Sequence, residues 1–174
     1  MEVKTLGIDL GKTVFHVVGL TAEGRIALKR RLTRTQLATL TANLPPCLIG
    51  MEACTGAHHM ARRLEAHGHV VRLLPPQYVR PYVKTSKNDF RDAEAIAEAV
   101  GRGTMRFVAL KTVAQLDLQA LHRVRERLVG HRTAVVNQIR GFLLDHGLPL
   151  RPGRIALRGE LRRLLAAEDE RISW

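Results

Sequence analysis

Residues 3–10 read Val-Lys-Thr-Leu-Gly-Ile-Asp-Leu and are followed by Gly11-Lys12-Thr13, and this stretch decides how the rest of the chain is interpreted. The run is mostly apolar and ends in turn residues, a pattern typical of a buried central strand. It carries one acid, Asp9, near its end. A carboxylate in a buried strand costs free energy unless a positively charged group meets it. The stretch therefore predicts a cationic partner for Asp9.

The composition indicates a globular, basic protein. With 174 residues, the chain is long enough for one domain with a real core and a small appendage. Hydrophobic residues make up 45% and charged residues 25%, which excludes an intrinsically disordered chain. The formal net charge of +12, from 28 Lys and Arg against 16 Asp and Glu, predicts a nucleic-acid partner, with a solvated basic surface as the alternative.

Three further features limit the class of protein. No apolar run approaches the roughly 18 residues of a membrane span, and the N-terminus shows no basic-then-apolar leader, so we expect a cytoplasmic protein. The two cysteines, Cys47 and Cys54, lack the spacing of a zinc site and are predicted to be buried thiols. Aromatic residues make up only 4%, which argues against a surface that stacks single-stranded bases.

The order of the expected strands and helices predicts the fold. Three strand-like segments come first and are expected to pair antiparallel, and helices and strands then alternate, which favours parallel pairing. The expected strands are 3–10, 14–20, 26–32, 47–51 and 69–74, with helices at 35–44, capped by Thr33 or Thr35, and at 57–67. This order is that of an α/β, ribonuclease H-like fold with a mixed sheet, the first strand central and the fourth beside it.

The remainder of the chain is predicted to be a basic connection followed by helices. Residues 78–87 read as a loop, and a helix over 88–101, capped by Asn88 or Asp89, completes a domain of residues 1–110. A long helix is expected over 113–146 and a shorter one over 160–169, so that residues 111–174 form a helical, coiled-coil-like extension. Its apolar seam predicts a partner, either a second copy in a homo-oligomer or a further domain.

Four acids stand where a metal site would need them. Asp9 lies near the end of the first strand, Glu52 follows the fourth, and Asp89 and Asp92 share one face of a helix because they are three residues apart. Carboxylate oxygens suit Mg²⁺ or Mn²⁺, and paired metals clamp the oxygens of a phosphodiester during cleavage. Each acid also has a structural alternative: Asp9 as a turn residue, Glu52 beside a helix dipole, and Asp89 with Asp92 as a helix cap.

Two other functions remain open from the residues alone. The sequence Asp-Leu-Gly-Lys-Thr at 9–13 resembles the first phosphate loop of actin-like and sugar-kinase ATPases, although the chain offers no second lobe. A catalytically silent module for nucleic-acid binding and dimerisation is the non-enzyme alternative. Either nucleic-acid function would use basic residues, and the candidates for phosphate contacts are Lys12, Arg80, Lys84, Lys87, Arg91, Arg123 and Arg127.

Three motifs resemble one known family. The motifs are Gly-Ile-Asp-Leu-Gly-Lys at 7–12, Gly-Met-Glu-Ala-Cys-Thr-Gly at 50–56 and Lys-Asn-Asp-Phe-Arg-Asp-Ala-Glu-Ala-Ile-Ala at 87–97. They resemble the DEDD transposases of bacterial insertion sequences, a family that includes the Piv/MooV-type DNA invertases. The similarity extends over roughly residues 3–148, with Leu-Gln-Ala-Leu-His-Arg-Val-Arg at 118–125 and Val-Asn-Gln-Ile-Arg-Gly-Phe-Leu at 136–143 as its continuation.

The resemblance implies a RuvC-like N-terminal domain whose four acids match Asp9, Glu52, Asp89 and Asp92. It also implies a long helical segment, a C-terminal domain with a catalytic serine, and DNA recombination directed by a structured guide RNA. This chain stops at Trp174 within the helical region, so we expect complete strand exchange to need more than this polypeptide.

Overall fold

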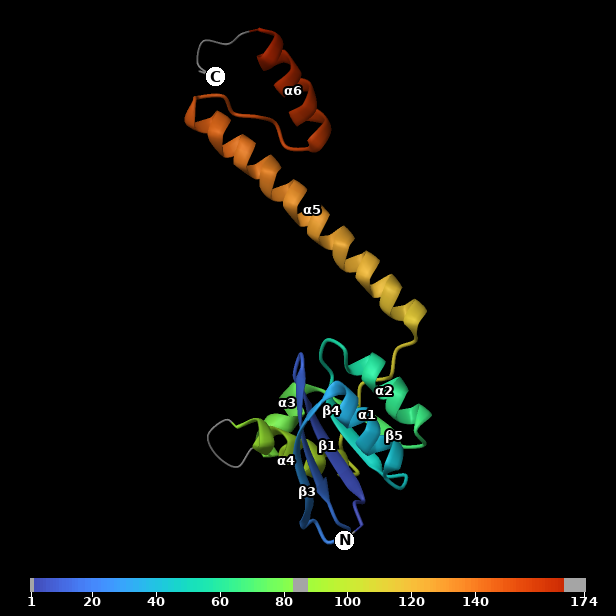
Figure 1. The fold of residues 1–174 in the computed structure, drawn as a ribbon. Coiled ribbons are helices and arrows are strands. Elements are labelled where there is room, and N and C mark those ends of the chain that lie inside the picture. The colour runs from blue at the N-terminus through green and yellow to red at the C-terminus, as the bar shows by residue number, and fades with distance from the viewer. Residues whose placement is uncertain (1, 83–87, 168–174) are drawn as a thin grey trace. The chain divides into compact units, whose positions relative to one another are not determined.

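A computed structural model describes residues 2–82 and 88–167, so the predicted contact residues Lys84 and Lys87 lie outside the described residues. The chain forms two compact units, Met1–Thr112 and Val113–Trp174. Each unit is described by itself below, and Figure 1 shows the elements of both.

The first unit is built on a mixed five-stranded sheet with the order β3-β2-β1-β4-β5. The strands are β1 (Thr5–Leu10), β2 (Val14–Leu20), β3 (Ile26–Thr33), β4 (Leu48–Glu52) and β5 (Val70–Leu74). The first three pair antiparallel, whereas β4 pairs parallel with both β1 and β5. The predictions of an α/β class, a mixed sheet, a central first strand and an adjacent fourth strand are therefore confirmed.

Two helices connect the strands and cover one face of the sheet. Helix α1 (Arg34–Asn43) begins with a capping box, in which the Thr33 hydroxyl accepts from the Gln36 amide and the Gln36 side chain accepts from the Thr33 amide. Helix α2 (Ala57–Ala66) follows β4. Their inward residues share one buried cluster with alternate residues of the strands, among them Leu37, Met60, Leu64, Leu6, Ile8, Ile49 and Met51.

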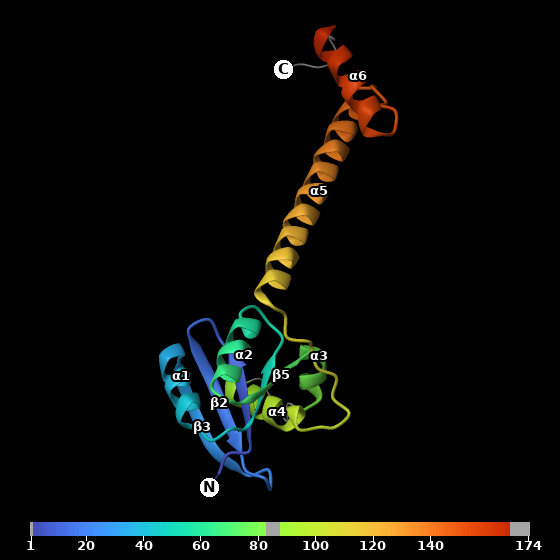
Figure 2. The same cartoon turned by 90° about the vertical axis from the view of Figure 1, so that its right-hand side faces the viewer.

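The opposite face of the sheet is covered by α4 (Asp89–Val100), so the unit has three layers (Figure 2). Because side chains alternate along a strand, the residues next in sequence to those facing α1 and α2 face α4 instead. They include Gly7 and Gly50. A Cβ at Gly7 would lie 2.0 Å from the Ala93 carbonyl oxygen, so α4 approaches β1 closely because this strand position has no side chain.

The predicted basic loop at 78–87 is partly helical, which corrects the sequence interpretation. The described part contains α3 (Pro76–Val79) and the 3₁₀ helix η1 (Arg80–Tyr82). Pro76 stands at the start of α3, where its fixed φ favours a helix and its missing amide hydrogen costs nothing. The prediction failed because four residues are too few to show a helical period.

The second unit consists of α5 (Val113–Asp145) and α6 (Arg154–Ala166). Helix α5 agrees with the predicted 113–146, but α6 begins six residues before the predicted 160. It starts after Gly153, whose φ of 98° is open to glycine, and its first turns are anchored by the buried Leu157. Leu143 and Leu148 form the buried centre of this unit. None of the described helices is long and apolar enough to cross a membrane.

Candidate functional site

Asp9 and Glu52 lie at the carboxyl ends of two neighbouring parallel strands. The paired residues of β1 and β4 end at Ile8 with Met51, and the two acids follow immediately. Because side chains alternate along a strand, Asp9 shares the face of Gly7 and Glu52 the face of Gly50, which is the face covered by α4. Both acids are half-buried. The topology therefore brings these two predicted residues to one edge of the sheet.

A cysteine lies close to both acids. Burial raises the pKa of the Cys54 thiol, and the negative charges of Glu52 and then Asp9 raise it further. Cys54 is nevertheless exposed, so the prediction of two buried thiols is wrong for this residue. It sits in the turn after β4, where the chain leaves the core. Cys47 is buried as predicted, and burial raises its pKa to about 11.

The first turn of α4 carries the other two acids to the same end of the sheet. The helix is capped by Asn88, whose side chain accepts from the Phe90 amide at 3.0 Å. Asp89 is therefore not the cap, and its exposed carboxylate lies 3.5 Å from Nδ1 of His16. This contact is an ion pair when the imidazole is protonated. Asp92 is half-buried in the same turn.

His16 is a residue of this region that the sequence analysis missed. It lies on β2 directly opposite Asp9 and packs edge-on against Phe90, with 4.7 Å between ring centroids. Lys29 of β3 lies over the same phenyl ring. The sequence did carry a signal for His16. The short turn after Leu10 sets the register of the hairpin, and this register puts the polar His16 of an otherwise apolar strand opposite Asp9.

The acids gather without forming a closed coordination shell. Among residues 2–82 and 88–167, no three Asp, Glu, His or Cys side chains lie close enough together to hold one metal ion. What the fold supplies is an edge of the sheet where Asp9 and Glu52 emerge beneath the helix turn of Asp89 and Asp92. An ion here would need further oxygen ligands from water or a bound phosphate.

Comparison with known proteins decides the family. The model of the IS110-type DEDD family, described as "Transposase", matches residues 6–147. The chain belongs to the DEDD transposases of insertion sequences. The match covers β4, α4, all of α5 and all of β1 except Thr5, so the resemblance seen in the sequence motifs is confirmed.

Several relatives of the transposase chain are named in the same terms. The chain is 46% identical, over 97% of its own length, to the "Probable family 20 transposase" of Pseudomonas aeruginosa. It is also 46% identical, again over 97% of its own length, to the "Transposase for insertion sequence element IS1328" of Yersinia enterocolitica. It is 45% identical over 96% of its length to the "Transposase for insertion sequence element IS1111A" of Coxiella burnetii. The chain spans about half the length of these relatives: 50%, 49% and 46% respectively.

The predicted basic contact residues of the transposase chain fall into separate places. Lys12 is exposed in the turn after β1, and Arg91 is exposed in the first turn of α4, so these two lie at the end of the sheet that carries the acids. Arg80 is exposed on η1. Arg123 and Arg127 are exposed on α5, in the other unit. The five described residues of the predicted set therefore come from both units.

His58, which the sequence places near Glu52, has a structural role. Its Nδ1 accepts a hydrogen bond from the Lys111 amide at 3.2 Å, and Arg62 donates to the Lys111 carbonyl at 2.6 Å. Burial lowers the pKa of His58, and the nearby charges of Lys111 and Arg62 lower it further. The pair ties the segment before α5 to α2.

The position of Cys54 allows a chemical test of its distance from the acids. The thiolate is the reactive form, and a raised pKa reduces the thiolate fraction near pH 8. We expect iodoacetamide to modify Cys54 more slowly than a free thiol at this pH, and Glu52→Gln to increase the rate severalfold by removing one negative neighbour. Mass spectrometry of the modified chain measures both rates.

The second cysteine is the internal control of this experiment. Cys47 is buried with a pKa of about 11 and should stay unmodified while the chain is folded. A Cys54→Ser chain should therefore take up no label. Equal rates for wild type and Glu52→Gln would contradict the proposed closeness of Cys54 and Glu52.

Proposed function

We propose that this chain is the metal-holding, nucleic-acid-binding half of a DNA recombinase, with a RuvC-like, ribonuclease H-like fold. The observation that carries the proposal is the placement of α4. Its first turn, with Asp89 and Asp92, lies at the carboxyl ends of β1 and β4, where Asp9 and Glu52 emerge. Ligand sites of α/β sheets commonly lie outside the carboxyl ends of their strands.

The donor chemistry fits Mg²⁺ or Mn²⁺. Mg²⁺ is usually bound through one or two carboxylates, with water and substrate phosphates completing the shell, so a site without three preassembled ligands suits it. When bound, a divalent ion would polarise a phosphodiester and lower the pKa of an attacking water. The site therefore suits a metal ion that binds together with a nucleic acid, whose phosphate completes the shell.

The residues of the proposed site have different roles. Asp9 and Glu52 are the proposed central ligands because they come from adjacent strands. Asp92 of α4 is the proposed third carboxylate and would have to move closer when an ion binds. Asp89, oriented by His16, is a proposed outer ligand. Lys12 and Arg91 are proposed phosphate contacts, because both lie at the acid-bearing end of the sheet.

The activity of the whole recombinase is proposed to need more than this half. The family resemblance implies a catalytic serine from a further domain and a guide RNA that directs DNA recombination. We also propose that α5 pairs with a second copy, because the apolar residues on its 3,4 spacing are exposed in the single chain. Without metal binding, the same chain would be a catalytically silent module for nucleic-acid binding and dimerisation.

Metal binding separates these two functions. We would titrate Mn²⁺ and Mg²⁺ into the chain by calorimetry, with and without a short DNA duplex, because a phosphate is expected to complete the shell. Asp9→Asn and Glu52→Gln are each expected to weaken binding by about tenfold or more. Asp117→Asn, at an exposed acid of α5, is the matched control and should bind metal as the wild type does.

The outcomes are distinct. Binding that both site variants weaken, and that the control leaves intact, supports a shared metal site. Binding that is absent in both titrations, or that ignores Asp9 and Glu52, would leave these acids as structural residues and favour the silent module. A steep loss of DNA affinity with salt fits both functions and does not separate them.

A further inference from the structure

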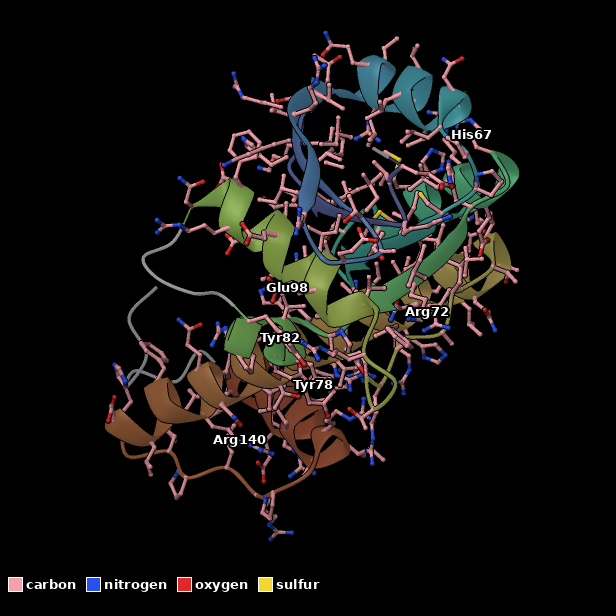
Figure 3. All side chains as sticks on the ribbon, turned by 90° about the horizontal axis from the view of Figure 1, so that it is seen from below. His67, Arg72, Tyr78, Tyr82, Glu98 and Arg140 are labelled. Carbon is pink, nitrogen blue, oxygen red and sulfur yellow. The ribbon has the colours of Figure 1, made fainter. Side chains whose placement is uncertain are left out.

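Both tyrosines of the chain gather at the β5 side of the first unit. Tyr78 of α3 and Tyr82 of η1 line a cleft of about 350 Å³ together with Met105 and Arg106 of the segment after α4. Pro81 and Thr104 complete its lining. Figure 3 labels the two tyrosines, with Glu98 on the neighbouring helix α4. We call this feature the tyrosine cleft.

The walls of the tyrosine cleft are held by the core. Tyr82, Met105 and Phe107 pack against a buried cluster that includes Val79, Ile96 and Val100. Tyr78 presents more of its ring, with 40% of its surface exposed. The cleft therefore combines fixed walls with one accessible aromatic face, and an aromatic face that is already in place loses little conformational entropy when it stacks on a ligand.

Positive charge surrounds the cleft. Residues 72–82 and 101–110 contain four arginines but no Lys, Asp or Glu. The guanidinium carbon of Arg102 lies 5.9 Å from the Tyr82 ring centroid, and that of Arg72 lies 4.7 Å from the Phe107 centroid. Glu98 is the acid that lies beside this region, four residues before Arg102. Aromatic rings beside basic side chains are the usual composition of a single-strand binding surface.

We propose that the tyrosine cleft stacks an unpaired base of a single-stranded nucleic acid, with Tyr78 as the stacking ring and Arg106 as a phosphate contact. This inference rests on the proposed function, because it names the surface at which a nucleic-acid-binding chain would hold a single strand. A duplex keeps its bases stacked inside the helix, so the ring would not contribute to duplex binding. Although the aromatic content is only 4%, the fold concentrates both tyrosines here.

Fluorescence anisotropy tests the cleft directly. The wild-type chain would be titrated, with EDTA present, into labelled oligo-uridine, oligo-deoxyuridine and a DNA duplex of equal length. We expect Tyr78→Ala to lose about tenfold in single-strand affinity, within the range known for one stacked base, and to bind the duplex as the wild type does. Tyr78→Phe keeps the ring and should keep the affinity.

A pair of arginine variants supplies the matched control. Arg106 lines the cleft, whereas Arg63 is an equally exposed arginine at the end of α2. Arg106→Ala should weaken single-strand binding more than Arg63→Ala. Circular dichroism melting of every variant shows that the fold is retained, which the exposure of Tyr78 favours.

The two single-strand probes also identify the ligand. Tighter, ring-dependent binding of oligo-uridine would assign the cleft to RNA, and tighter binding of oligo-deoxyuridine to DNA, since these two probes differ only in the 2′-hydroxyl. Unchanged single-strand affinity in Tyr78→Ala overturns the proposed cleft and leaves the proposed function standing if the duplex still binds. A wild-type chain that binds neither form overturns both, whereas failure of the metal titration alone leaves the cleft intact.

Discussion

Gly7→Val is expected to prevent α4 from packing on the sheet and to leave little folded protein. A Cβ at this position would lie 2.0 Å from the Ala93 carbonyl oxygen and 2.5 Å from the Ala97 amide nitrogen. Both are backbone atoms, so no side-chain rotation relieves the clash, and the whole helix would have to move away. Because α4 carries Asp89 and Asp92, the same movement would take two acids away from Asp9.

The smaller variant Gly7→Ala gives a measurable version of this effect. Overpacking a core typically costs about 1–3 kcal/mol and more where the backbone must shift, against a total stability of about 5–15 kcal/mol for a domain. We expect urea denaturation of Gly7→Ala to show a loss at or above the upper end of that range. Gly50→Ala should lose less, because its new Cβ would meet side chains of Ile96 and Val100, which can adjust.

Gly103→Ala is the matched control. No atom lies within 4 Å of a Cβ at this position, and its φ lies outside the left-handed region. Its free energy of unfolding should stay within about 0.5 kcal/mol of the wild-type value. If Gly7→Ala and Gly103→Ala unfold at the same urea concentration, the close packing of α4 on β1 is wrong.

Leu128→Asp is expected to abolish self-association of the chain, the second of the two largest effects. Leu121, Val124, Leu128 and Val135 follow an alternating spacing of three and four residues on α5, and each is more than 40% exposed in the single chain. Such a seam is buried when two helices pair. A charge at Leu128 would be buried twice in the pair, so the dissociation constant should rise by roughly 100-fold or more.

The charges beside this seam set the salt dependence of pairing. Arg125 stands next to Val124 and Arg127 next to Leu128, so two paired copies bring like charges together. Screening by salt weakens this repulsion. We therefore expect self-association of the chain to strengthen with added salt, in contrast to nucleic-acid binding, which weakens.

Analytical ultracentrifugation at low and high salt measures both effects. Thr133→Asp introduces the same charge on the same helix, five residues away and off the seam, and should associate as the wild type does. A wild-type chain that remains monomeric at high salt would overturn the proposed pairing of α5. Equal behaviour of Leu128→Asp and Thr133→Asp would show that association uses another surface.

Much of the fold could be predicted from sequence because its signals are local. The first three strands, the capping box at Thr33 and the long α5 follow from runs of residues whose period or cap is visible in the chain. The mixed sheet followed from the order of these elements, since parallel strands need a crossover helix. The family could also be predicted, because three short motifs carry it.

The candidate site was only partly predictable, because its partners are distant in sequence. Asp9, Glu52, Asp89 and Asp92 were found as separate acids, and only the structure shows that Asn88 rather than Asp89 caps α4. His16 was missed because its contact with Asp89 depends on the packing of α4, although the hairpin register already places it opposite Asp9. Cys54 was expected inside because free cysteines are usually buried, but the turn exposes it.

Sequence by itself determined the family, the class of fold and the identity of the four acids, since all three depend on residue type and order. Tertiary structure alone decided which residues meet. Gly7 and Gly50 let α4 approach the sheet, and that approach sets the acid-bearing turn at the ends of β1 and β4. The tyrosine cleft arises in the same way, since chain segments that are some 25 residues apart become its two walls. The physical reason is that a site is made by contacts across the sheet, and such contacts leave no period in the chain.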